Sequence, residues 1–395
     1  MLKRIARTKD NKTFYSFLPT VMFFITSVQL VHSDVKQSDL IDDWSMLKTG
    51  KDIYYVACVA CHGTRGQGSD PTMLGFDPGP PDFTDCKFTS REMTSDWIGI
   101  ATHGGPLKGF SAMMPAFGKA LSEKQIDSVV TYIKNFCPES KWPPGEFNLP
   151  KALNTGKAFP EDEIAWSVSA DLDDYVSVKG KFVIARRVAA RHQIEAVIPL
   201  EVHRLEPATE GDDESRWGKG AGDIAAAWKS VLWFSRSAGS IGSITFDLFF
   251  PTGNRKDGIG SGTVLFEPAL AIAQIVPRIC FLQLQGGVEL SADTALKNHV
   301  VFWRGAFGQT FKRGGVGRSF SPMIEVLGER ELSEENSSTE WSLVPEFQLA
   351  LSRRHHVRLG TGMAIPITDF DTRPINFMAY LVWDWYDGGF TEGWQ

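Results

Sequence analysis

The segment Cys58-Val59-Ala60-Cys61-His62 constrains this chain more than any other feature. Two cysteines at this spacing lie one helical turn apart, and with the adjoining histidine they form the attachment motif of a covalent c-type haem. In such a site both thiols form thioether bonds, and the histidine is an axial ligand of the iron. A dithiol redox pair and half of a zinc site are the alternatives, but no second C-x-x-C follows to complete a zinc site.

The segment from Gly104 to Gly118 contains Met113-Met114-Pro115 and resembles the distal Met-Pro loop of small class I cytochromes c. The resemblance implies that Met114, which directly precedes the proline, is the second axial ligand of the iron. A thioether ligand favours ferrous iron and raises the reduction potential, as an electron carrier requires. Met113 and His103 are the alternative ligands.

The residues after this loop predict a helix. Ser122-Glu123-Lys124-Gln125 has the pattern of a capping box. Apolar residues then follow at helical spacing as far as Cys137, namely Ile126, Val129, Val130, Ile133 and Phe136. The same resemblance implies that this helix packs across a haem-bearing helix at about 44–60. It also implies that residues 38–138 form one all-α cytochrome c domain with a single covalent haem c.

The first residues have the pattern of a secretory signal peptide, which we expect over 1–33. Basic residues precede an apolar run from Phe17 to Val31, and the small residue Ser33 follows shortly after it. An uncleaved membrane anchor is the alternative, although the run is short for a span. Export agrees with the haem motif, because haem c is attached outside the cytoplasm.

An exported chain enters an oxidising compartment, so we expect Cys86 and Cys137 to form a disulfide. Closing a loop of this length would stabilise the domain by about 4 kcal/mol in the chain-entropy model. Two buried unpaired thiols are the alternative. Cys280 is left as a lone apolar residue on a predicted strand.

The formal net charge of −6 argues against a nucleic-acid partner. Residues 139–160 are rich in proline with little apolar periodicity, which predicts a linker. From residue 161 onwards the period changes to two, as in 244–250, 282–290 and 341–351. Such alternation is typical of strands with one apolar and one polar face.

Three features favour an antiparallel transmembrane β-barrel of about twelve strands over 161–395, with a soluble β-sandwich as the alternative. The strand count is even, and most segments reach the roughly nine to eleven residues that a tilted strand needs to cross a bilayer. Short turns alternate with longer polar loops, as periplasmic turns and extracellular loops do. Aromatic residues such as Trp233 and Trp383 lie near segment ends, where an interfacial girdle would place them.

Three short segments of this region also resemble a known family, namely Gly222-Asp223-Ile224, Phe250-Pro251-Thr252-Gly253 and Gly260-Ser261-Gly262. Over about 160–395 the chain resembles the Gram-negative outer-membrane channels named for a phenol-degradation pathway (MetA-like). The resemblance implies an outer-membrane location. One departure is the end of the chain, Gly393-Trp394-Gln395, because outer-membrane barrels usually finish on an aromatic residue.

Together these patterns predict a periplasmic cytochrome c domain fused to a barrel in the outer membrane of a Gram-negative bacterium. The expected function is one-electron transfer by a haem bound to Cys58 and Cys61, with periplasmic redox proteins as partners and outer-membrane lipid around the barrel. With His62 and Met114 both on the iron no substrate reaches it, so we do not expect an enzyme. The alternative function is an outer-membrane channel for a small solute, gated by the haem domain or reporting redox state through it. A peroxidase-like enzyme would need an open iron or a second haem.

Overall fold

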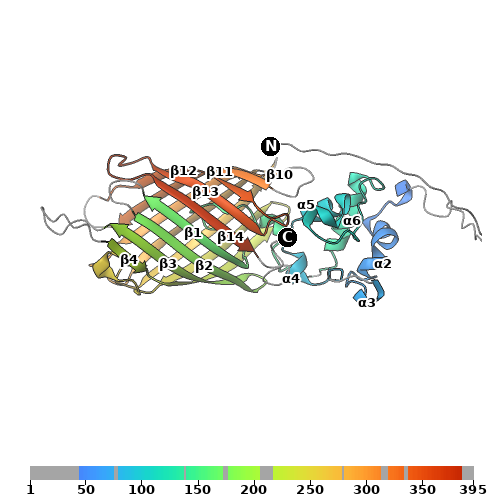
Figure 1. Cartoon of the computed structure of the whole chain (residues 1–395), viewed down its shortest axis with the longest axis horizontal. Helices are drawn as coiled ribbons and strands as arrows, with labels where there is room; N and C mark the ends of the chain where they lie inside the picture. The colour runs from blue at the N-terminus through green and yellow to red at the C-terminus, as the bar shows by residue number, and fades with distance from the viewer. Residues whose placement is uncertain are drawn as a thin grey trace, which may run out of the picture. The chain divides into compact units, whose positions relative to one another are not determined.

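The computed structural model describes residues 44–74, 79–137, 139–171, 177–204, 217–277, 280–312, 319–332 and 337–384. The predicted signal peptide and the C-terminal Trp394 lie outside these ranges. In the described part, a set of short helices comes first and a large antiparallel sheet follows (Figure 1). None of the described helices has the length and apolar character needed to cross a membrane.

The helical domain contains a continuous helical run that carries the C-x-x-C-H motif. This run consists of α1 (Gly50–Ile53), the π-helical turn η3 (Tyr54–Cys58) and α2 (Val59–His62). The other elements of the domain are η2 (Trp44–Met46), α3 (Pro71–Leu74), α4 (Cys86–Thr89), α5 (Thr94–His103), η4 (Gly105–Lys108) and α6 (Glu123–Lys134).

The predicted helix after residue 122 is confirmed as α6, and its capping box is formed. The Ser122 hydroxyl accepts a hydrogen bond from the Gln125 N–H, and the Gln125 side chain accepts one from the Ser122 N–H. One face of α6 joins a single buried core with residues from the rest of the domain: Ile53, Tyr54, Phe83, Trp97, Leu121, Ile126, Val129, Val130 and Ile133. A disulfide between Cys86 and Cys137, with Cα atoms 5.1 Å apart, joins α4 to the segment that follows α6.

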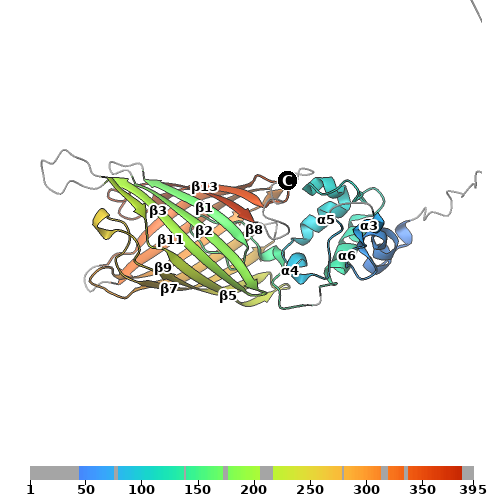
Figure 2. The same cartoon turned by 60° about the horizontal axis from the view of Figure 1, so that its bottom comes forward.

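The sheet closes on itself as an antiparallel barrel (Figures 1 and 2). β1 pairs with β14 from Glu163↔Asp384 to Asp171↔Asn376, which joins the first strand to the last. β4 and β5 follow one another along the same edge of β3, and β9 and β10 do so along β11, so the barrel has twelve strands as predicted. The strands are β1 (Glu163–Asp171), β2 (Ser177–Ala189), β3 (His192–Arg204), β4 (Trp217–Ala221), β5 (Ala225–Ser235), β6 (Ser240–Phe249), β7 (Leu265–Val276), β8 (Cys280–Ser291), β9 (His299–Gln309), β10 (Phe311–Lys312), β11 (Ser319–Leu332), β12 (Glu340–Ala350), β13 (Val357–Pro366) and β14 (Asn376–Asp384).

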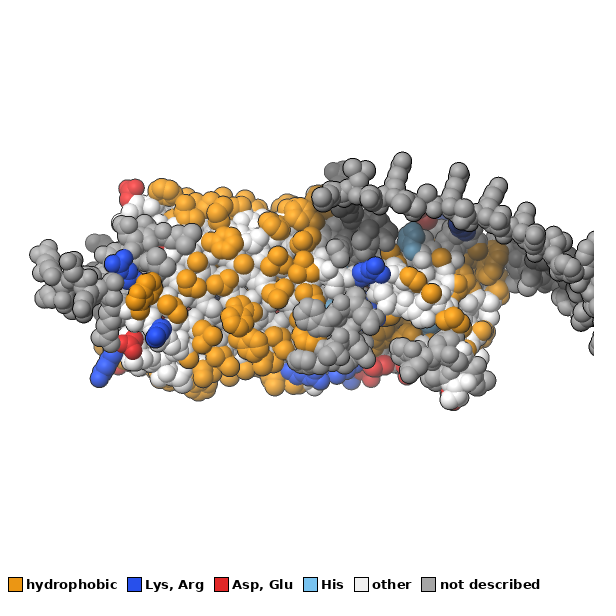
Figure 3. Space-filling model, viewed as in Figure 1, with side chains coloured by type: hydrophobic (Ala, Val, Ile, Leu, Met, Phe, Trp, Pro, Cys, Tyr) orange, Lys and Arg blue, Asp and Glu red, His pale blue; other side chains and the backbone are white. Residues whose placement is uncertain are grey.

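The outer surface of the barrel is apolar, and many inward-facing side chains are polar. On β11 the carboxylate of Glu325 is fully buried, whereas its neighbours Ile324 and Val326 expose 43% and 40% of their surface. Apolar side chains cover the visible outer face of the barrel (Figure 3). A closed barrel leaves no unpaired edge, and an apolar outer surface of this extent is stable in lipid. The barrel is therefore of the outer-membrane type.

Residues 147–162, which we call the plug, run from the last residue of η5 (Gly145–Phe147) to the start of β1 and lie inside the barrel. Four apolar side chains of the plug are buried in one cluster with inward-facing residues of five strands. The plug contributes Phe147, Leu149, Ala158 and Phe159, and the strands contribute Val231, Ile241, Ala271, Ala273, Phe281 and Met323. The predicted linker region thus contains a segment with specific packing inside the lumen.

The crossing of α1 and α6 yields a testable prediction at Gly50. A Cβ atom at Gly50 would lie 2.1 Å from the backbone oxygen of Ser128 on α6, so only glycine permits this approach. We expect Gly50→Ala to lower the free energy of opening of the helical domain by about 1–3 kcal/mol, as overpacked cores do. Hydrogen exchange of the α6 amides measures this energy.

Gly99→Ala in α5 is the matched control, because its Cβ would meet only a leucine methyl at 3.1 Å. Alanine is also the better helix former. Equal exchange rates in the Gly50→Ala and Gly99→Ala variants would show that the crossing does not depend on glycine.

Candidate functional site

The two cysteines of the motif are free thiols on adjoining elements. Cys58 ends η3 and Cys61 lies in α2, so the helical run places them about one turn apart. Both side chains are half-buried. Burial, with a smaller contribution from Cys61, raises the pKa of the Cys58 thiol to about 12, so this thiol is protonated at neutral pH.

The imidazole of His62 lies against the ring of Phe83, with centroids 4.7 Å apart. Desolvation lowers the pKa of His62 to about 4, so its ring is neutral at neutral pH and retains a lone pair. The Nδ1 atom of His62 is buried and has no hydrogen-bond partner among the described residues. Buried polar atoms normally have a partner, so this one is consistent with a site that receives a further group.

The backbone after the motif is held in place by Tyr54 and by a returning loop. The Tyr54 hydroxyl donates to the carbonyl oxygen of Gly63 at 2.6 Å. Gly63 ends α2 with a φ of 74°, a conformation that favours glycine. The N–H of Gly68 then donates to the carbonyl oxygen of His62 at 3.0 Å. These contacts restrain the end of the helix that carries His62.

The Met-Pro loop is closed by hydrogen bonds of its own backbone. The Gly105 N–H donates to the carbonyl oxygen of Met114 at 3.0 Å, and the Phe110 N–H donates to that of Gly105 at the same distance. The two methionines differ in burial, because Met114 is half-buried whereas Met113 exposes 59% of its surface. His103, at the end of α5, is exposed.

These residues fit a covalently attached haem. Two free thiols lie about one turn apart, a neutral imidazole with an unpartnered nitrogen adjoins them, and a half-buried thioether is presented by a closed loop. The thiols can form the thioether bonds to the haem, and the imidazole and the methionine thioether can each bind the iron.

A second cluster of polar contacts holds the plug in the barrel. Glu325 accepts hydrogen bonds from the backbone N–H groups of Asn154 and Thr155 and from both of their side chains. Other inward-facing side chains accept from further plug N–H groups: Gln348 from Lys151, Glu346 from Leu153, Gln285 from Gly156 and Gln193 from Glu161. The irregular backbone of the plug is thus satisfied by side chains from strands on several sides of the lumen.

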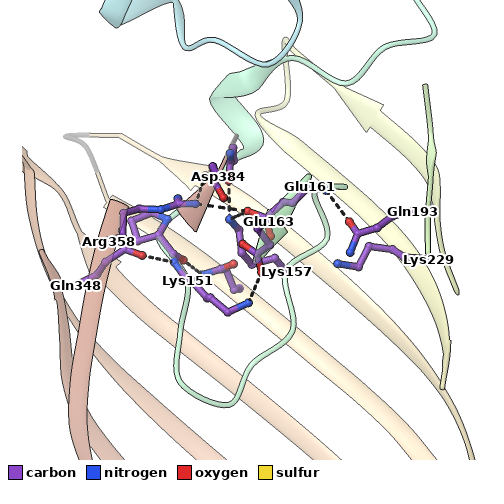
Figure 4. A network of polar contacts seen from close by, with 12 residues as sticks. Lys151, Lys157, Glu161, Glu163, Gln193, Lys229, Gln348, Arg358 and Asp384 are labelled. Atoms are coloured by element: carbon purple, nitrogen blue, oxygen red, sulfur yellow. Dashed lines mark hydrogen bonds and ion pairs between the residues drawn. The ribbon is translucent and has the colours of Figure 1, made fainter. Parts of the chain in front are cut away.

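Ion pairs add to this cluster where the plug meets β1, β13 and β14 (Figure 4). Lys151 pairs with Glu163 at 2.8 Å, Lys157 pairs with Glu161, and Arg358 pairs with Asp384. The three carboxylates have oxygen atoms within 4.8 Å of one another, a spacing that could hold a metal ion. Since each carboxylate already has a cationic partner, we interpret the group as an ion-pair network.

Both ends of the plug contact residues of the helical domain. Asp162, at the end of the plug, pairs with Arg91, and both side chains are buried. Glu146, directly before the plug, accepts a hydrogen bond from the Thr94 N–H at 2.9 Å and pairs with Lys134 at 3.6 Å. The chain is therefore bonded to the helical domain where the plug begins and again where it ends.

The lumen contains a cavity of about 460 Å³ between the plug and the longer loops. Its charged lining residues lie toward the longer loops and include Glu267, Glu289, Lys297, Arg304, Glu329 and Glu340. Arg304 also donates to the carbonyl oxygen of Asn154 at 3.1 Å, so this lining is in contact with the plug.

The plug residues were not identified as a site from the sequence. One available signal was β7, which is apolar on both faces along Ala269-Leu270-Ala271-Ile272-Ala273. In a water-filled barrel the inward face of such a strand should be polar. An apolar inward face therefore indicates that another part of the protein covers it.

Comparison with known proteins finds a family model that matches the helical domain. Residues 45–133 match the family model described as cytochrome C oxidase, cbb3-type, subunit III. A solved c-type cytochrome, KustC0563, is similar over 23% of this chain and 99% of its own, with 23% identity and a TM-score of 0.20. Comparison with curated protein sequences gives no match.

Solved outer-membrane proteins are similar to the larger part of the chain. An outer membrane channel from Pseudomonas putida F1 is 12% identical over 60% of this chain and 100% of its own, with a TM-score of 0.42. The KdgM porin is 8% identical over 56% of this chain and 99% of its own, with a TM-score of 0.38. The chain joins a domain that matches a cytochrome c family model, which implies haem c, to a closed twelve-strand barrel with an apolar outer surface.

The contacts of Glu325 yield a testable prediction about the plug. Glu325→Gln keeps the shape of the side chain but replaces a charged acceptor of four donor groups with a neutral amide. Hydrogen bonds to charged groups contribute about 1.5–3 kcal/mol, so we expect the amides of Asn154 and Thr155 to exchange about tenfold faster or more. Hydrogen exchange read by mass spectrometry on a peptide covering 150–158 measures the change.

Glu329→Gln is the control, because Glu329 lies on the same strand and is exposed. If the two variants exchange at the same rate over 150–158, Glu325 does not hold the plug.

Proposed function

We propose that this protein is an electron carrier in which a covalent haem c transfers one electron at a time on the periplasmic side of the outer membrane. The observation that carries the proposal is the combination of two free thiols about one turn apart with an imidazole whose buried Nδ1 has no partner among the described residues. A bound haem would supply reversible one-electron chemistry at its iron.

Each residue of the site has a separate part in this proposal. Cys58 and Cys61 would hold one haem by thioether bonds, and the restrained end of α2 would orient His62 toward the iron. Met114, presented by the closed Met-Pro loop, would be the second protein ligand. With both ligands supplied by the protein, the chain would carry electrons and would not catalyse a reaction on a substrate.

The topology of the barrel supports a periplasmic position for the haem domain. The start of β1 pairs with the end of β14 at Glu163↔Asp384, so the haem domain is connected to the end of the barrel that carries the short turns. In outer-membrane barrels the short turns are periplasmic. The partners of the haem domain are then periplasmic redox proteins, and the barrel serves as its membrane anchor.

A haem stain after a denaturing gel of outer-membrane fractions tests attachment and compartment together. We expect a haem-positive band of the full-length chain, retained under denaturing conditions because the thioether bonds persist. Loss of the stain in a Cys58→Ser, Cys61→Ser double variant that still reaches the membrane completes the test. A wild-type band without stain would refute covalent attachment.

Substitution of the two methionines tests the axial ligand. In Met114→Ala we expect the haem to stay attached, the reduction potential to fall and the weak long-wavelength band of methionine ligation to disappear. Exogenous ligands should then bind the iron. Met113→Ala is the matched control and should keep the band. Loss of the band in Met113→Ala with its retention in Met114→Ala would exchange the two assignments.

A further inference from the structure

The apolar contacts of the plug differ from those expected in a conducting barrel. Phe147 and Phe159 each expose 2% of their surface, and on the barrel wall Ile241 is fully buried. An open lumen would leave these side chains in water. The wall residues that meet the plug belong to β5, β6, β7, β8 and β11. With β9, which lies between β8 and β11, these strands form about half of the circumference.

Polar contacts hold the plug on the remaining strands. Arg358 on β13 pairs with Glu161 at 3.8 Å as well as with Asp384 on β14. Tyr380 on β14 is buried and donates to the carbonyl oxygen of Lys151. With Gln193 on β3 and Glu346 on β12, these side chains complete the ring of contacts around the plug.

The lumen on the loop side of the plug is different. Lys179 and Lys181 face inward from β2 and are exposed, although they lie within the barrel. The cavity of about 460 Å³ lies on this side, and its lining includes five glutamates and two basic residues. Among the described residues, exposed charged side chains thus line the lumen between the loop end and the plug.

We propose that the plug permanently closes the turn end of the barrel, so that the lumen is a blind vestibule open only at the loop end. A solute from outside the cell enters the vestibule and does not cross. The proposal excludes the passive channel function that a barrel of this size would otherwise allow, and it does not depend on the haem.

Single-channel recording of the purified full-length protein in a planar bilayer is the first test. We expect no conductance steps in potassium chloride, because a buried apolar cluster and paired charges fill the cross-section. Sustained steps in the wild-type protein would overturn the proposal.

Thiol labelling in intact cells is the second test, with an impermeant maleimide applied from outside. Lys181→Cys lies in the vestibule, and Ala273→Cys lies under the plug, where Ala273 exposes 2% of its surface. We expect Lys181→Cys to react at least about tenfold faster, since access controls the rate at comparable thiols. The wild-type protein, which carries Cys280, sets the background. Equal rates at the two positions would overturn the proposal.

A third variant tests whether the plug itself provides the protection. Ala158→Trp adds a large ring to the closed apolar cluster and should destabilise the seated plug. Labelling of Ala273→Cys should then rise about fivefold or more. Ala196→Trp, on the exposed outer face of β3, is the matched control and should leave the rate unchanged. Heat-dependent gel mobility verifies that each barrel is folded, and unchanged labelling in a folded Ala158→Trp variant would refute the role of the plug.

Discussion

Satisfaction of backbone hydrogen bonds in lipid is the constraint on which the rest of this structure depends. A strand in a bilayer has no water to bond, so the sheet must close, and the pairing of β1 with β14 closes it. Closure fixes which side chains face lipid and which face the lumen. On β11 it turns Ile324 outward and Glu325 inward. The inward carboxylates and amides then become the partners of the plug, whose own backbone forms no strand.

Local patterns explain why much of this architecture could be predicted from the sequence. The capping box at Ser122 and the apolar spacing behind it specify α6 within one stretch of chain. Alternation with a period of two specifies each strand in the same way, because side chains of a strand point to opposite faces. The even count and the alternation of turn and loop lengths then define the barrel. The motif at Cys58, Cys61 and His62 is likewise contained in five residues.

The plug could not be predicted in this way because its partners are distant in the sequence. Asn154 and Glu325 are 171 residues apart, and nothing near Asn154 indicates which strand will supply its acceptor. Prolines and the absence of periodicity made 139–160 look like a linker, since both features are typical of linkers and also of a segment whose backbone is bonded by side chains. The doubly apolar β7 was one signal that the lumen was covered. An apolar inward face shows that some segment must pack against it, but it does not show which segment does so.

The charges of the plug relate its packing to the haem domain. Lys151, Lys157 and Arg358 balance Glu161, Glu163 and Asp384, so the buried network is neutral where the dielectric is low. Loss of any one partner would leave an uncompensated buried charge. The network therefore favours the one position of the plug in which all of these charges are paired. Asp162 comes directly after Glu161 and pairs with Arg91 of the helical domain. Asp162, which binds the helical domain, therefore lies between Glu161 and Glu163, two members of the buried network. A barrel whose plug is bonded in this way to its haem domain is better suited to anchor that domain than to pass a solute beside it.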